Sequence, residues 1–181
     1  MCAAVSGASF PAALAFVLSQ EGSWADLSGD PGGATNFGIT LRTLQSYQQG
    51  ATVEDLKAIP ASMVSVIYRR EYWTVIGCDN LPSGPDLSTF DAGVNCGPAR
   101  SIGFLQTVAG VRRDGIDGAI TQAAVAKMSA SDVITKLAGL RKAFYEADPN
   151  FPRFGEDWLR RNEQCAVAAL RLIPGNMPCV M

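Results

Sequence analysis

Apolar residues recur at helical intervals along most of the chain. The run Pro11–Leu18 is almost wholly apolar and follows Ser9, a residue type that often caps helices, so we predict a buried first helix that ends at Glu21-Gly22. Ala61–Tyr72 has the spacing of an amphipathic helix. Further helices are expected at residues 41–48, 54–59, 98–108, 120–128, 131–146 and 157–171. The pattern is therefore mainly helical.

Three segments interrupt the helical pattern. Gly22–Gly38 is rich in Gly, Asp, Ser and Pro and runs into the alternating sequence TNFGIT, which predicts a short β-hairpin. Ala147–Gly155 is predicted to be a loop. Gly77–Leu87 is short and rich in Gly and Pro, and it is the best candidate for a boundary. We therefore expect two regions, residues 1–86 and residues 87–181, packed together as one globule.

The composition narrows the possible chemistry. The 181 residues include no histidine, which excludes Ser-His-Asp and Cys-His nucleophile systems and the usual catalytic zinc sites. The net charge of −2 argues against a nucleic-acid partner. The five cysteines include no C-x-x-C pair, so neither a zinc ribbon nor a redox motif is expected, and reduced thiols are the simplest interpretation. Hydrolytic chemistry in this chain must therefore use carboxylates, hydroxyls and backbone groups.

The apolar run near the N-terminus also bears on localisation. No Lys or Arg precedes Pro11–Leu18, and the run is far shorter than the roughly 20 residues that a membrane span requires. We therefore expect no signal peptide, no membrane association and a cytoplasmic location. A secretory signal is the alternative interpretation of the same run.

Candidate catalytic residues are densest between Glu21 and Thr40. Glu21 ends an apolar helix, where burial and the helix dipole are expected to raise its pKa and make it a proton donor. Asp30 lies in a Gly/Pro loop where it can stay ionised, and the Thr35 hydroxyl can hold a water molecule. One protonated and one ionised carboxyl group are what glycosidic bond cleavage requires. An ordinary helix end followed by a turn remains the alternative interpretation.

Other residues have both a binding and a structural interpretation. Tyr72 and Trp73 could stack on sugar rings, although aromatic residues that end a helix are more often in the core. Asn36 and Asn95 could bind N-acetyl groups, although Asn in turns usually serves the backbone. A calcium loop is excluded because Pro31 stands where such a loop needs glycine. No metal or cofactor is therefore expected.

Several motifs together resemble one known family. The segment EG-x7-DPGGATNFGIT resembles the N-terminal signature of glycoside hydrolase family 108, lysozyme-like N-acetylmuramidases found mainly as phage and prophage endolysins. The segments FDAGVNCGPARSIGFLQ and DGIDGAIT resemble the helical peptidoglycan-binding region that accompanies this family. The resemblance covers roughly residues 10–172. It implies a catalytic region at residues 1–86 and a peptidoglycan-binding region at residues 87–181.

The resemblance also implies a fold and a reaction. The fold would be α+β, mainly helical and lysozyme-like, with a small β-hairpin. The reaction would be hydrolysis of the β-1,4 bond between N-acetylmuramic acid and N-acetylglucosamine in peptidoglycan glycan strands. Glu21 would be the catalytic acid, Asp30 the second carboxylate and Thr35 the water-positioning hydroxyl. A monomer that reaches the wall through a holin-type release partner is implied.

The chain departs from the family pattern at two positions. Ser23 stands where a second glycine is common, and Cys96 stands where histidine is common. The second change removes a polar group near the expected cleft, which puts a substrate role for that position in doubt. Two alternative functions stay open, a lytic transglycosylase and a wall-binding module without catalysis.

Overall fold

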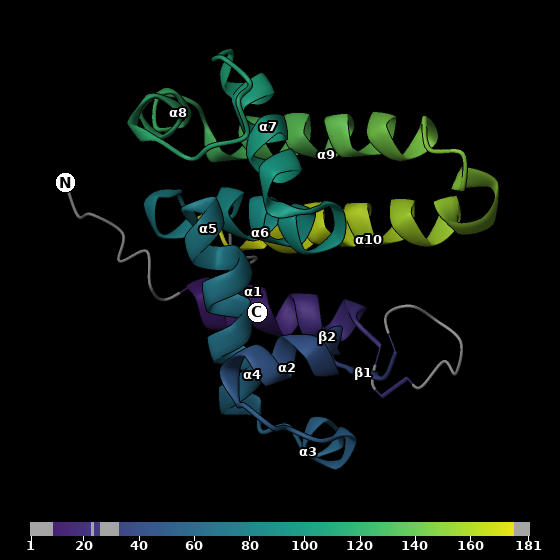
Figure 1. The fold of residues 1–181 in the computed structure, drawn as a ribbon. Helices are drawn as coiled ribbons and strands as arrows, with labels where there is room; N and C mark the ends of the chain where they lie inside the picture. The colour runs from purple at the N-terminus through teal and green to yellow at the C-terminus, as the bar shows by residue number, and fades with distance from the viewer. Residues whose placement is uncertain (1–8, 23, 26–32, 176–181) are drawn as a thin grey trace, which may run out of the picture.

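The computed structural model describes residues 9–22, 24–25 and 33–175. The predicted α+β class is confirmed, because helices dominate and one small antiparallel hairpin is present (Figure 1). The elements in chain order are α1 (Ser9–Gln20), β1 (Thr35–Asn36), β2 (Ile39–Thr40), α2 (Leu41–Tyr47), α3 (Val53–Lys57), α4 (Ala61–Tyr68), the π-helix η2 (Arg69–Trp73), α5 (Thr74–Ile76), the 3₁₀ helix η3 (Cys78–Asn80), α6 (Pro85–Cys96), α7 (Pro98–Ala109), α8 (Ala119–Val125), α9 (Ala130–Glu146) and α10 (Phe151–Arg171).

Helix α6 lies at the centre of the molecule. Every residue from Pro85 to Gly93 is buried, and the helix contacts α1, α7, α9 and α10. This helix therefore joins elements from both ends of the chain into one packed unit. The boundary expected between residues 86 and 87 falls within the first turn of α6.

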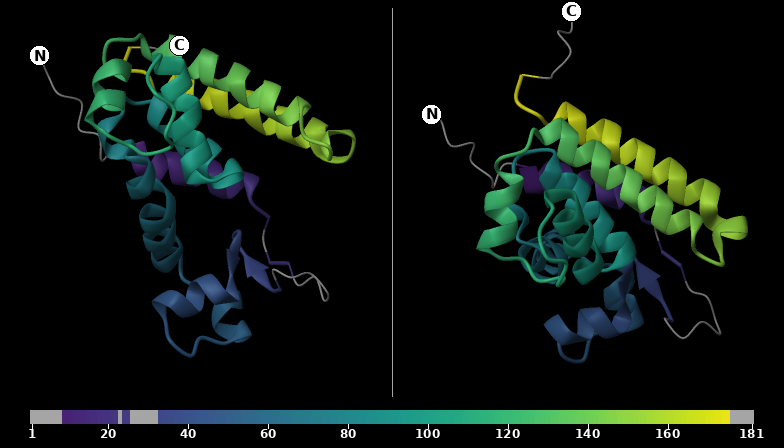
Figure 2. Two further views of the ribbon diagram at one scale, coloured as in Figure 1. Left: turned by 45° about the horizontal axis from the view of Figure 1, so that its top comes forward. Right: turned by 90° about the horizontal axis from the view of Figure 1, so that it is seen from above.

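Helices α9 and α10 pack side by side as a long antiparallel pair (Figures 1 and 2). The prediction of a loop over Ala147–Gly155 is wrong in its second half, since α10 begins at Phe151. Pro152 fits the first helical turn, where a missing N–H costs nothing. Gly155 is buried against the ring of Phe151, so a glycine inside the helix has a packing role here. Among the described residues, no helix is long and apolar enough to cross a membrane.

The predicted hairpin is present and very short. Thr35 pairs with Thr40 and Asn36 pairs with Ile39, while Phe37 and Gly38 form the turn with positive φ values of 50° and 69°. Together with α2 and α3, the hairpin forms a small lobe on the side of the molecule away from α9 (Figures 1 and 2). The hairpin turn therefore projects from this lobe toward the end of α1.

The predicted helix over Ala61–Tyr72 is continuous but not uniform. Regular α-helix ends at Tyr68, and Arg69–Trp73 forms a π-helical segment. Such wide turns shift the side chains that follow relative to a regular helix and are frequent at functional sites. Here the segment turns Trp73 into the core, where its ring packs edge-on against Phe10 and Phe90.

Candidate active site

Glu21 continues the last turn of α1. Its backbone N–H donates to the carbonyl of Val17 at 3.0 Å, and its side chain is only 21% exposed. The Oε1 atom accepts a hydrogen bond of 2.8 Å from Nη1 of Arg161 on α10. The side chain is mostly buried, as expected from the sequence, whereas the sequence gave no indication of the contact with Arg161. This contact holds one oxygen of the carboxyl group at a charged donor.

The hairpin turn closes against the same carboxylate. A Cβ atom at Gly38 would lie 3.0 Å from Oε2 of Glu21 and 3.0 Å from the hydroxyl oxygen of Tyr68. That hydroxyl donates to the carbonyl of Phe37 at 2.8 Å, which ties the turn to α4. Both the close approach and the left-handed backbone at Gly38 require a glycine. The two oxygens of Glu21 thus face different surroundings, Arg161 on one side and the turn on the other.

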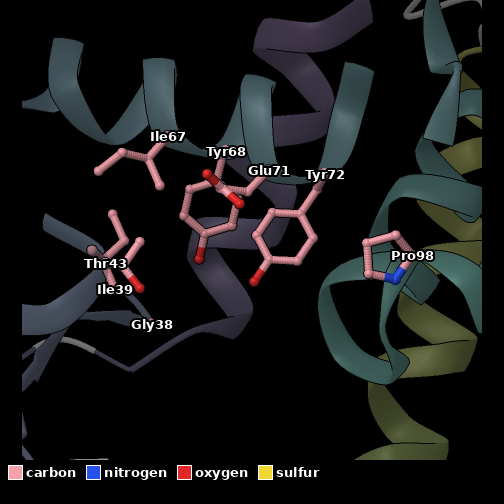
Figure 3. A pocket seen from close by; sticks show the side chains of 8 residues that line it. All are labelled: Gly38, Ile39, Thr43, Ile67, Tyr68, Glu71, Tyr72 and Pro98. Carbon is pink, nitrogen blue, oxygen red and sulfur yellow. The ribbon is translucent and has the colours of Figure 1, made fainter. Parts of the chain in front are cut away.

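A pocket of about 290 Å³ is lined by Gly38 and Tyr68, the two residues of the preceding contacts, while Glu21 itself is not part of its lining (Figure 3). The hydroxyls of Tyr68 and Tyr72 point toward the side on which Gly38 lies. Burial and the nearby Glu21 raise the pKa of both tyrosines, so they remain neutral hydrogen-bonding groups at neutral pH. The complete lining is Gly38, Ile39, Thr43, Ile67, Tyr68, Glu71, Tyr72 and Pro98. The pocket therefore lies between the small lobe, α4 with η2, and the start of α7.

Two comparisons relate this architecture to known proteins. A sequence model described as glycosyl hydrolase 108 matches residues 14–97, a range that includes Glu21 and most of the pocket. The solved structure of SagA from Brucella abortus is 37% identical to the chain, covers 97% of it and 99% of its own length, and gives a TM-score of 0.81. Among curated protein sequences, none matches the chain.

The chain belongs to glycosyl hydrolase family 108. Membership makes it a glycoside hydrolase that degrades peptidoglycan, and the likeness to SagA supports the predicted lysozyme-like fold. The likeness to SagA also extends beyond residues 14–97, because it covers 97% of the chain and so includes α9 and α10.

Three polar residues were predicted for this family 108 site, namely Thr35, Asn36 and Asp30. Thr35 is half-buried in β1, and its backbone N–H donates to the carbonyl of Ala25 at 2.8 Å. Asn36 is buried, and its side-chain amide donates to the carbonyls of Leu56 and Lys57, where it terminates α3. Asp30 lies outside the described residues, and its role as the second carboxylate stays a prediction. Of the three, Thr35 and Asn36 are held in the hairpin that contacts Glu21.

The two aromatic candidates separate clearly. Tyr72 is half-buried, lies 5.6 Å from Tyr68 between ring centroids, and lines the pocket. Trp73 is completely buried, and its indole N–H donates to Asp79 at 2.8 Å. The structural interpretation of Trp73 thus fits its surroundings, and Tyr72 is the one of the pair within reach of a ligand in the pocket.

Asn95 lines a second pocket, of about 190 Å³, near the end of α6. Its side-chain oxygen accepts from the hydroxyl of Tyr145 at 2.6 Å, and the thiol of Cys96 lies 3.6 Å from the same hydroxyl. Burial raises the pKa of Cys96, so the residue that replaces the family's common histidine is a neutral thiol. Pro98 lines the first pocket, so the two pockets flank the same corner between α6 and α7.

Sequence reasoning did not find Arg161, Asp91 or Tyr68. Arg161 lies 140 positions beyond Glu21, and nothing in its local sequence distinguishes it from the other cations of α10. Asp91 carried no clear signal, because α6 also contains Asp86, Ser88 and Thr89, and the burial of these residues is seen only in the structure. Tyr68 has the spacing of an apolar position in its helix, so its contacts with the hairpin turn could not be expected.

Proposed function

We propose that this family 108 chain is an N-acetylmuramidase that hydrolyses the β-1,4 bond between N-acetylmuramic acid and N-acetylglucosamine. The observation that carries the proposal is the position of Glu21, a mostly buried carboxyl group at a helix end, against Gly38, which together with Tyr68 and Tyr72 lines an open pocket. Carboxyl groups in such positions serve as general acids in glycoside hydrolysis.

The different surroundings of the two oxygens of Glu21 give the acid a defined direction. Oε1 is engaged by Arg161, while Oε2 faces Gly38 and the hydroxyl of Tyr68. The proton to be transferred would therefore reside on Oε2, on the side of the pocket. Donation of this proton to the glycosidic oxygen releases the leaving sugar as positive charge develops on the other ring. In the proposal, Asp30 stabilises that charge or orients the attacking water, and Thr35 helps to hold the water.

The pocket supports a sugar-binding role for its aromatic wall. Tyr72 presents a ring and a neutral hydroxyl to the pocket, a combination suited to the apolar face and hydroxyl groups of a pyranose. Asn95 stays a candidate for an N-acetyl group in the second pocket. Beyond the catalytic region, we propose that the helical region at residues 87–181 also contacts the wall.

The substitution Glu21→Gln tests the assignment of the acid. Glutamine can still accept the hydrogen bond from Arg161, so the fold should persist while proton donation is lost. We expect the rate of clearing of purified walls to fall by at least roughly 100-fold, with an unchanged circular dichroism spectrum. Glu54→Gln, at an exposed position on α3, serves as the matched control and should clear walls as the wild type does. Undiminished clearing by Glu21→Gln would exclude Glu21 as the acid.

We further propose an endolysin role for a monomeric enzyme. In this role the chain accumulates in the host cytoplasm and reaches the wall after a holin-type partner opens the membrane. Production in the bacterial cytoplasm should then be tolerated until a pore-forming agent is added, and lysis should follow at once. Lysis without any pore former would contradict the need for a release partner, and sedimentation of the purified chain tests the monomer.

A further inference from the structure

Arg161 is the cation that contacts the proposed acid among the described residues. Its Nη1 lies 2.8 Å from Oε1 of Glu21, while its Nε and Nη2 lie 2.9 Å and 2.8 Å from Oδ1 of Asp91. The side chain is only 12% exposed. A guanidinium held along one edge by Asp91 has little freedom to move, so it offers Glu21 a donor at a fixed point.

A second buried ion pair fixes Asp91 in turn. The carboxylate of Asp91 is completely buried on α6, and its Oδ2 lies 2.9 Å from Nη1 of Arg141. Arg141 is 1% exposed on α9, and it also donates to the hydroxyl of Tyr145. The chain of contacts Glu21–Arg161–Asp91–Arg141 thus joins α1, α10, α6 and α9. Two arginines balance two carboxylates along it, so the group is neutral when Glu21 is ionised.

We infer that Arg161 is a positioning residue for Glu21, and that helix α10 therefore belongs to the active site. The inference rests on the proposed muramidase function. Arg161 binds Oε1 and so turns Oε2, the oxygen that would carry the proton, toward Gly38, a residue that lines the pocket. Arg161 lies outside residues 14–97, the part of the chain that the family model matches. The proposed acid is therefore oriented by a residue of the region 87–181, for which the sequence indicated only wall binding.

The surroundings of Glu21 contain a single cation among the described residues. Glu21 is faced by Arg161 from α10, by Tyr68 from α4 and by Tyr72 from η2, with Asp91 of α6 behind the arginine. Removal of Arg161 therefore takes away both the donor to Oε1 and the local positive charge.

Three variants separate positioning from a purely structural role. Arg161→Met removes the donor and the charge, and Arg161→Lys keeps the charge without the two-sided contact. Arg160→Met is the matched control, because the neighbouring Arg160 is 65% exposed and pairs only with Asp157 among the contacts described. For each variant, kcat and KM on purified walls are measured and corrected for the folded fraction. The carbon-13 NMR signal of the Glu21 carboxyl group, in protein labelled at glutamate, reports the surroundings of Glu21 independently of activity.

We expect Arg161→Met to lose roughly 10- to 100-fold in kcat with little change in KM, because the acid is no longer held in place. Arg161→Lys should recover only part of the kcat. Wild-type kcat in both variants would overturn the inference. If Arg161→Met does not fold, Arg161→Lys decides the question, because wild-type kcat in that variant contradicts positioning.

The two readouts also separate this inference from the proposed function. A carboxyl signal of Glu21 that shifts in Arg161→Met but not in Arg160→Met, in an enzyme whose wild type releases no reducing ends, would refute the muramidase and leave the Arg161 contact intact. Reducing ends from the wild type, combined with a Glu21 signal and a kcat that do not respond to loss of Arg161, would refute only the positioning role.

Discussion

Gly38 brings the backbone of the hairpin turn against the carboxyl group of Glu21. A side chain at this position meets both Oε2 of Glu21 and the hydroxyl of Tyr68 at 3.0 Å, and the residue has a φ of 69°. The position therefore combines backbone strain with crowding of the acid. These two effects can be separated, because Gly50 has a similar φ of 79° but open space, with nothing within 4 Å of the point that a Cβ atom would occupy.

The comparison of Gly38→Ala with Gly50→Ala uses this difference. Both substitutions should lower the free energy of unfolding by about 1–2 kcal/mol, because both force alanine into the left-handed region. Only Gly38→Ala should also lower kcat, by roughly tenfold or more, because it displaces the acid. Chemical denaturation and initial rates on purified walls measure the two quantities. Equal activities in the two variants would show that the turn does not constrain Glu21.

At the residue scale, Glu21 carries a signal of its own in the sequence, because it stands at the end of an apolar helix next to a glycine. The structure places it against Gly38, and its role as the acid stays a prediction. Arg161 could not be found in this way, because its role depends on the folding of α10 against α1. The role of Asp30 stays a prediction. The pair Tyr72 and Trp73 shows a different difficulty. Both lie in the π-helical segment, and the sequence did not indicate that Tyr72 would line the pocket and Trp73 would be buried.

At the scale of elements, the contact between the hairpin and α3 fixes the small lobe. The buried side chain of Asn36 donates to two carbonyls at the end of α3, at 3.0 Å and 3.1 Å. These bonds satisfy carbonyl groups that a helix end leaves without partners. Asn36 therefore acts on the placement of the hairpin, and through it on the turn at Gly38.

Asn36→Ala tests whether this residue binds substrate or supports the lobe. Loss of the two hydrogen bonds should lower the free energy of unfolding by about 1–3 kcal/mol, since the carbonyls stay buried without partners. The KM for purified walls should change little once the folded fraction is taken into account. A large rise in KM without any loss of stability would instead identify Asn36 as a substrate ligand.

Most helices could be predicted because their apolar spacing extends over several turns. Helix α9 begins one residue earlier than expected and ends where expected, and α7 begins at the expected Pro98. The start of α10 was missed because Ala147–Gly155 contains two prolines and a glycine, which are normally loop residues, and Pro152 and Gly155 in fact lie inside the helix. The π-helical turn was missed because the same apolar spacing fits a regular helix.

At the scale of the whole molecule, the buried ion pairs link helices that are distant in sequence. Asp91 of α6 lies between Arg161 of α10 and Arg141 of α9, and its side chain is inaccessible to solvent. The mainly helical α+β class could be predicted from the hydrophobic pattern. The ion-pair chain could not, because nothing in the spacing of these charges indicates which of them meet in the core.

Asp91→Asn should destabilise the whole protein. The substitution leaves buried Arg141 without its ionic partner, and breaking such a pair costs about 3–5 kcal/mol in the free energy of unfolding. Asp157→Asn breaks an exposed pair with Arg160 and should cost less than about 1 kcal/mol. Denaturant titrations of both variants, followed by circular dichroism and tryptophan fluorescence, measure the difference. Similar small costs would show that the chain of ion pairs does not hold α6, α9 and α10 together.

The most direct test of the proposed reaction is the chemical identity of the new chain ends. Purified walls are digested with the wild type, reduced with borohydride and analysed by mass spectrometry. A muramidase with Glu21 as its acid predicts reduced N-acetylmuramic acid at the ends of the fragments, and no such ends from Glu21→Gln. Reduced N-acetylglucosamine ends, 1,6-anhydromuramic ends, or muramic ends released equally by Glu21→Gln would contradict it.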